Sequence, residues 1–155
     1  MTIESAQCTF LKASAELRDS LQAAGGQVHY SPGQTLFREE DSNRGVYLLL
    51  KGQLRMTVRG LPNLDRLFSA GSVLGLPSTF TGHPYSLTAQ AVTEVEVVHV
   101  SSDRFVQLMR EQTELCREAT AMLGREVTFI QSALAERRKQ AAAAKISPAE
   151  IGALV

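Results

Sequence analysis

The chain has 155 residues and no net charge, because 16 basic residues balance 16 acidic ones. A chain of this length forms one domain, and its neutral balance excludes the strong charge bias of many proteins that bind nucleic acid, membranes or acidic partners. Two cysteines, Cys8 and Cys116, have no metal-ligand spacing, which predicts unpaired thiols and no zinc site. There is no signal-peptide pattern and no apolar run of about 20 residues, so we expect a cytoplasmic protein.

Residues 1–26 form a helical lead. Apolar residues at helical spacing occupy 9–24, and Gly25-Gly26 ends the pattern. Residues 27–100 then follow a period of two: Leu54, Met56 and Val58 alternate with polar residues, as in a strand with one buried face. Val46 to Leu50 is nearly all apolar, which is typical of a strand covered on both faces. Many short strands separated by Gly and Pro predict an antiparallel sandwich or barrel, so the fold is mainly β with flanking helices.

Residues 101–144 are helical. Ser101, Ser102 and Asp103 are good capping residues, and a break at Gln112-Thr113 starts a second helix that runs to about Ala144. In the short tail, residues 145–155, Pro148 indicates one last helical turn or a frayed end.

Two apolar rows follow this long helix. The first row is a coiled-coil-like seam, and the second is interrupted by Glu126. Two rows need two covering surfaces, so we expect one to pack on the barrel and the seam to pair with the same helix of a second subunit. The alternative is that one broad face packs on the barrel alone. The seam is Cys116, Thr120, Leu123, Val127, Ile130 and Leu134, and the second row is Leu115, Ala119, Met122, Phe129 and Ala133.

The segment Gly75-Leu76-Pro77 to Pro84-Tyr85-Ser86 has the frame of a phosphate-binding loop. Together with Pro32-Gly33, the run Tyr47 to Gly52 and the long helix, it resembles the cyclic-nucleotide-binding domain of the Crp/Fnr type over roughly residues 10–140. The resemblance implies a double-stranded β-helix, or jelly-roll barrel, followed by a long C-terminal dimerisation helix. It also implies that residues 75–86 are the family's phosphate-binding cassette.

At the sugar and phosphate, the resemblance places Leu76 where the family has a glutamate and Tyr85 where it has an arginine. Leucine makes no hydrogen bond, and tyrosine makes one neutral contact where arginine makes two charged ones. The loss amounts to several kcal/mol, or at least about a hundredfold to a thousandfold in affinity.

At the base, Arg125 falls on a family arginine, but Ile130 and Gln131 stand where hydroxyl residues read adenine. We therefore doubt tight binding of cyclic AMP or cyclic GMP and expect a pocket for a small polar or anionic ligand. Its candidate residues are Gly75, Leu76, Pro77, Ser78, Tyr85, Ser86, Thr88 and Gln131.

No catalytic motif, metal site or cofactor site is evident, and His29, His83 and His99 form no cluster with the cysteines. The family's transcription factors continue into a helix-turn-helix domain, for which this chain has no room, so we expect no direct DNA binding. The favoured hypothesis is a stand-alone, dimeric regulatory module that binds another small molecule or none. Two alternatives stay open: a transcriptional regulator subunit that acts on DNA through a partner chain, and an interaction module whose pocket its own side chains fill.

Overall fold

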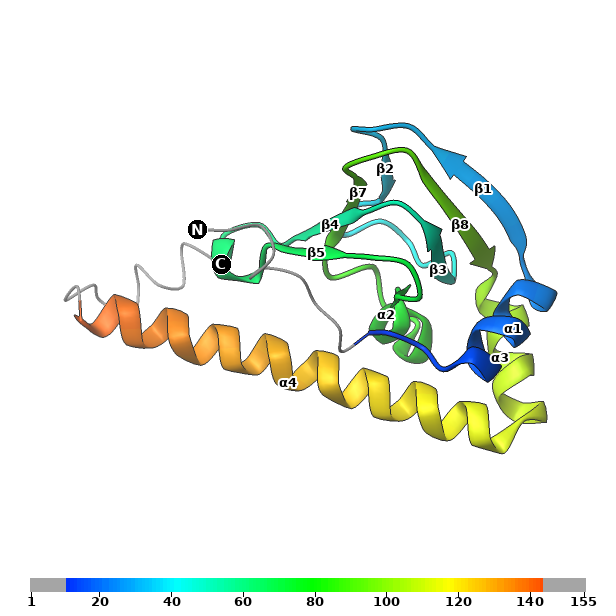
Figure 1. The fold of residues 1–155 in the computed structure, drawn as a ribbon. Coiled ribbons are helices and arrows are strands. Elements are labelled where there is room, and N and C mark those ends of the chain that lie inside the picture. The colour runs from blue at the N-terminus through cyan, green and yellow to red at the C-terminus, as the bar shows by residue number, and fades with distance from the viewer. Residues whose placement is uncertain (1–10, 144–155) are drawn as a thin grey trace.

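Two four-stranded antiparallel sheets face each other in the computed structural model, which describes residues 11–143 (Figure 1). The predicted jelly-roll sandwich is therefore confirmed. The first sheet has the order β1 (Gly26–Tyr30), β8 (Val95–Val100), β3 (Val46–Lys51) and β6 (Val73–Leu74). The second has the order β2 (Thr35–Phe37), β7 (Thr88–Ala91), β4 (Leu54–Thr57) and β5 (Arg66–Phe68), with a short 3-10 turn, η2, at Pro62–Leu64.

The strands bury the residues that their patterns predict. In β3, residues 46–49 are all buried, because α1 covers one face of the first sheet and the second sheet faces the other. In β4, Leu54 and Met56 are buried while Arg55 between them is exposed, which confirms the predicted alternation for these residues; Val58 lies past the end of the strand and is half-buried. These two strands lie in different sheets, so their apolar residues meet in one core.

The leading helix α1 (Ala15–Ala24) begins later than the pattern predicts. Before it, the chain is extended: the Leu11 carbonyl accepts a hydrogen bond from the Val73 amide, and the Ala13 amide donates to the Gly71 carbonyl, both at 2.9 Å. Pairing with the edge of β6 thus overrides the helical spacing of these residues. Ser14 then caps α1 by accepting from the Leu17 amide.

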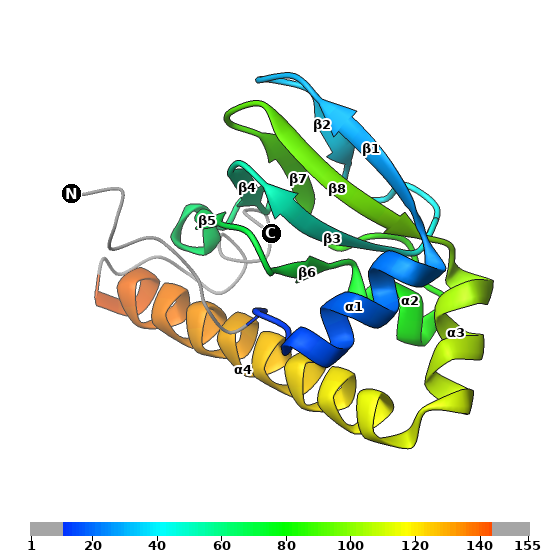
Figure 2. The same ribbon diagram turned by 45° about the vertical axis from the view of Figure 1, so that its right-hand side comes forward.

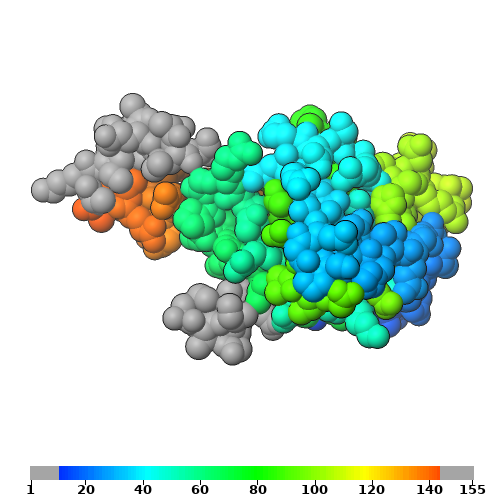
Figure 3. All heavy atoms as spheres, turned by 90° about the horizontal axis from the view of Figure 1, so that it is seen from above, coloured from blue at the N-terminus to red at the C-terminus, as the bar shows by residue number. Residues whose placement is uncertain are grey.

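The C-terminal helices are α3 (Ser102–Glu111) and α4 (Thr113–Ala143), the latter 31 residues long. Figure 2 shows α1 and α3 side by side at one end of the sandwich, with α4 running beneath both sheets. Seen from above, the last turns of α4, in orange, extend past the residues around η2 (Figure 3). Cys8 and the tail 145–155 lie outside the described residues.

The two rows of α4 differ in burial. In the row that faces the sandwich, Leu115, Ala119, Met122 and Ala133 are buried. The seam is more open: Val127 is 42% exposed, Thr120 is exposed, and Cys116, Leu123, Ile130 and Leu134 are half-buried. Within residues 11–143, no helix has both the length and the hydropathy of a membrane span.

Candidate functional site

The cassette loop forms a short helix, α2 (Leu76–Thr81), between the sandwich and α4 (Figure 1). Gly75 precedes it with φ of 94°, and a Cβ there would lie 2.8 Å from the Gly45 carbonyl oxygen. Only glycine fits both this backbone conformation and this close approach. This close approach fixes the start of α2 against the start of β3.

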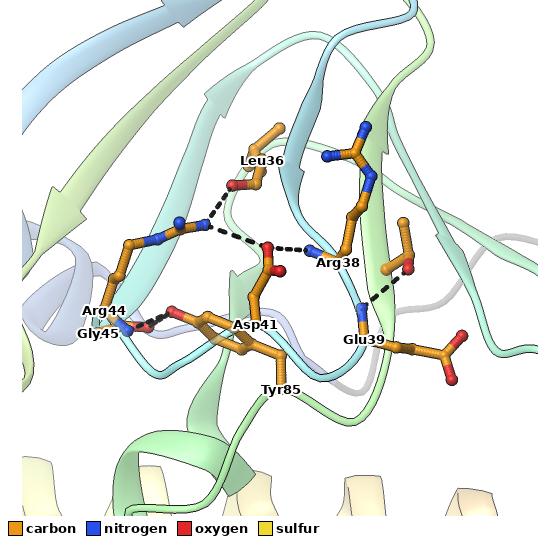
Figure 4. Close-up of polar contacts among 8 residues, drawn as sticks. Leu36, Arg38, Glu39, Asp41, Arg44, Gly45 and Tyr85 are labelled. Atoms are coloured by element: carbon orange, nitrogen blue, oxygen red, sulfur yellow. Dashed lines mark hydrogen bonds and ion pairs between the residues drawn. The ribbon is translucent and has the colours of Figure 1, made fainter.

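Tyr85 turns inward from the end of the cassette. Its side chain is 2% exposed, and its ring stacks on Phe37 with 4.0 Å between centroids. Its hydroxyl accepts from the Arg44 amide at 3.0 Å and donates to the Gly45 carbonyl at 2.7 Å (Figure 4). Burial raises the pKa of Tyr85 to about 12, so the phenol is neutral and both of its hydrogen bonds persist across the physiological range. Tyr85 is thus a satisfied core residue.

The hydroxyls of α2 already have partners. Ser78 donates to the His83 carbonyl at 2.5 Å and accepts from the Asn43 amide group at 2.8 Å. The same Asn43 group donates to the Thr79 hydroxyl at 3.1 Å, and its oxygen accepts from Ser102. Sequence reasoning missed Asn43, because nothing in its polar loop marks it as the partner of a distant helix. Its contacts hold α2 against the start of α3.

Glu126 of α4 reaches the same place. Its side chain is 2% exposed, and its Oε1 has no hydrogen-bond partner among the described residues. It lines a cavity of only about 10 Å³, which is room for about one water molecule. Burial raises the pKa of Glu126 to about 7. The cavity is lined by Phe37, Gly75, Pro77, Ser78, Tyr85, Ser86, Leu87 and Glu126.

The sequence signal for Glu126 was present: it is the one charged position within the row that packs on the sandwich. A buried carboxylate with an oxygen that lacks a partner is rare in proteins, because desolvation disfavours the charged form. Above its pKa the group places negative charge beside the cassette. The site therefore combines a buried, neutral tyrosine with a buried acid.

The structure brings together five of the eight candidate pocket residues, and it places the other three elsewhere. Leu76 is 1% exposed within the core, and the Thr88 hydroxyl accepts from the Glu39 amide at 3.1 Å. Gln131 is exposed on α4 and does not line this cavity. The five that share the cavity are Gly75, Pro77, Ser78, Tyr85 and Ser86.

The chain is similar in sequence to a known domain family and to curated regulators. The family model described as "Cyclic nucleotide-binding domain" matches residues 27–112. The chain is 32% identical over 128 residues to the nitrogen fixation regulation protein FixK of Bradyrhizobium diazoefficiens, covering 80% of this chain and 52% of that protein. It is 23% identical over 112 residues to the CRP-like cAMP-activated global transcriptional regulator of Mycobacterium tuberculosis, covering 70% and 50%. The chain thus spans about half the length of the curated relatives that it matches.

Among solved structures, the catabolite activator protein of Thermus thermophilus superimposes with a TM-score of 0.69 at 21% identity. The match covers 83% of this chain and 62% of that one. At this identity the likeness concerns the fold: a sandwich of two sheets with flanking helices and a long C-terminal helix.

Proposed function

The chain belongs to the cyclic-nucleotide-binding domain family of the Crp/Fnr type, and from this membership we propose that it is a regulatory domain. In this domain, side chains of the chain itself fill the cassette, so that cyclic AMP and cyclic GMP cannot enter it. The observation that carries this proposal is the inward position of Tyr85. A ring that is 2% exposed, stacked on Phe37 and bonded at its hydroxyl to residues 44 and 45 occupies space at the phosphate end of the cassette.

Size supports closure. Pockets for small molecules have volumes of about 300–1,000 Å³, whereas the cavity at the cassette has about 10 Å³. To admit a nucleotide, Tyr85 would have to leave the Phe37 ring and give up both hydrogen bonds of its hydroxyl. The main-chain groups of Arg44 and Gly45 would then need new partners.

Charge supports closure as well. The resemblance assigns an arginine to the place of Tyr85, and that cation is absent. Glu126 is buried beside the cavity, and above its pKa of about 7 it is an anion without a compensating hydrogen bond at Oε1. A phosphate would meet this carboxylate at low dielectric, where like charges repel most strongly.

Calorimetric titration with cyclic AMP and cyclic GMP, each to about 1 mM, tests closure. We expect no saturable heat from the native chain. The matched variant combines Leu76→Glu, Tyr85→Arg and Glu126→Gln, and circular dichroism confirms that it is folded. Recovery of nucleotide binding in this variant alone would support closure. Micromolar or tighter binding to the native chain would overturn it.

We further propose that the seam of α4 is the interface of a homodimer. Five of the six seam residues are apolar, and all five are half-buried or exposed, while four of the five apolar residues in the second row are buried. Val127, 42% exposed, is the most open apolar position of the seam. Burial of such a stripe against its own copy removes apolar surface from water.

Sedimentation velocity tests the dimer. Val127→Glu places a charge in the seam and should shift the chain to monomer. Thr128→Glu adds the same charge at the neighbouring exposed position, outside the seam, and should leave the dimer intact. A native chain that remains monomeric at about 100 μM, or equal behaviour of the two variants, would count against this interface.

We propose a regulatory output without catalysis, and the names of the two relatives support it, since both are regulators. The seam would also allow α4 to pair with the corresponding helix of a longer relative and so act on DNA through that partner. Mixing the chain with a full-length Crp/Fnr protein and measuring heterodimers by native mass spectrometry tests this second candidate. Exclusive homodimers would exclude it.

A further inference from the structure

A second pocket opens between the two sheets, where residues of β1, β3 and β8 face β2 and the segment that follows it. It has a volume of about 400 Å³, within the range of small-molecule sites. It shares only Phe37 with the cassette cavity. We call it the Arg44 pocket. Its lining residues are Val28, Tyr30, Thr35, Leu36, Phe37, Arg38, Asp41, Arg44, Tyr47 and His99.

The floor of the Arg44 pocket is aromatic. Tyr47 is 4% exposed, and its ring lies 5.5 Å from the ring of Phe37 and 4.9 Å from the ring of His99. Tyr30 and Val28 extend this surface from β1, and Val28 is 37% exposed. Rings in contact with one another present a rigid apolar surface on which a flat ligand can lie.

The rim of the pocket carries charge. The Arg44 guanidinium donates to the Leu36 carbonyl at 3.0 Å and lies 3.8 Å from the Asp41 carboxylate (Figure 4). Arg38, the residue directly after β2, lines the pocket as well and is drawn beside Asp41 in Figure 4. Two guanidinium groups and one carboxylate leave one net positive charge, which suits a monoanion better than a phosphate dianion.

The main chain of Arg44 is fixed on both sides. Its amide donates to the Tyr85 hydroxyl at 3.0 Å, and its carbonyl accepts from the His99 Nε2 at 2.6 Å. Its side chain is about half exposed and carries five N–H donors, more than its contacts with Leu36, Asp41 and the Tyr47 hydroxyl use. A guanidinium held in one place before binding loses less conformational freedom when an anion arrives.

We propose that the Arg44 pocket binds a small aromatic carboxylic acid, with its ring on Tyr47 and Tyr30 and its carboxylate on the Arg44 guanidinium. This site goes beyond the closed cassette and does not depend on it. Tyr85 connects the two regions, because the hydroxyl that closes the cassette also holds the backbone of Arg44.

Phenylacetate is the probe, and heteronuclear NMR titration reports both affinity and location. We expect saturable shifts at residues of the Arg44 pocket, with phenylacetamide and acetate each binding at least about tenfold more weakly, because one lacks the charge and the other the ring. Arg44→Gln should weaken phenylacetate at least about tenfold. Arg59→Gln, an exposed arginine outside the pocket, should leave the affinity unchanged.

Val28→Glu gives a second variant in case Arg44→Gln does not fold, since it adds a negative charge at an exposed position of the same pocket. It should also weaken phenylacetate. Equal affinity for phenylacetamide, no saturation by about 10 mM, or indifference to both pocket variants would overturn the assignment. Shifts centred on Gly75 to Ser86 and competition by cyclic AMP would also overturn it, and would at the same time contradict the closed cassette. Absence of both binding events would leave closure standing and exclude the Arg44 site alone.

Discussion

Tyr85 and Phe37 stack with 4.0 Å between ring centroids and 19° between ring planes. This contact joins the end of the cassette to β2 and leaves both side chains 2% exposed or less. An arginine at the position of Tyr85 would leave its charge in this apolar contact unless a phosphate accompanied it. The stack therefore explains how a loop with the frame of a phosphate site can be part of the hydrophobic core.

Tyr85→Phe tests the hydroxyl. The ring contact with Phe37 remains, but the Arg44 amide and the Gly45 carbonyl each lose their partner in a buried place. We expect the free energy of unfolding to fall by about 1–3 kcal/mol. Urea denaturation followed by circular dichroism measures it. Tyr30→Phe, in a half-buried tyrosine of the same sheet sandwich, is the control and should cost less than about 0.5 kcal/mol. Equal losses in the two variants would contradict the role of the Tyr85 hydroxyl.

Glu126 should make stability depend on pH. Its pKa is raised from 4.5 to about 7 by burial, so between these values the folded chain holds a proton that the unfolded chain has released. Raising the pH through this window therefore favours unfolding. The contribution of the Glu126 proton to the free energy of unfolding is lost progressively until the pH exceeds about 7. The free energy of unfolding should therefore fall by about 3 kcal/mol in total, at 1.36 kcal/mol per pKa unit.

Glu126→Gln isolates that contribution. Because glutamine does not titrate, the variant should lose the decline in stability between pH 4.5 and 7 and should be more stable than the native chain at pH 8. Glu136→Gln, at an exposed position of α4, should keep the native pH profile. Urea denaturation at several pH values supplies the comparison, and parallel profiles for the native chain and Glu126→Gln would show that Glu126 is not the titrating group.

Glu40 has φ of 73°, the one non-glycine residue with positive φ in the described part of the chain. The left-handed conformation strains a side chain with a Cβ, and the Glu40 amide donates to the Tyr85 carbonyl at 2.8 Å, which holds the turn in place. Glu40→Gly should raise the free energy of unfolding by about 0.5–1 kcal/mol. Glu39→Gly should lower it, since Glu39 accepts from the Arg59 amide through its side chain. A loss of stability in Glu40→Gly would contradict the strain.

Ser14 links α1 to α4. Its amide and hydroxyl both donate to the Glu118 carboxylate, at 2.7 Å and 2.6 Å, and its hydroxyl also accepts from the Leu17 amide. Ser14→Ala should therefore cost about 2 kcal/mol, against about 1 kcal/mol for Ser101→Ala, which removes the cap of α3. A double-mutant cycle with Glu118→Gln, measured by thermal unfolding, separates the link from the cap. Additive effects of the two changes would show that no link exists.

Local pattern predicted most of the elements. Neighbouring residues alone specify the period of a strand, as in the alternation of Leu54 and Met56 and the apolar run of β3. They also specify the ends of helices, as at the caps Ser101 and Gly25. The predicted start of α1 was wrong, because Leu11 and Ala13 pair with the edge of β6. This contact spans some sixty residues of sequence, and no local pattern indicates it.

The sequence by itself determined the sandwich and the long helix, and it predicted Tyr85 at the place of a family arginine, because periodicity and motif spacing can be read along the chain. Only the tertiary structure decided what those replacements do. In the folded chain Tyr85 stacks on Phe37, the Ser78 and Thr79 hydroxyls accept hydrogen bonds from Asn43, and Glu126 lies beside the cassette. These contacts join segments far apart in sequence, and their energies depend on burial, which exists only once the chain has folded.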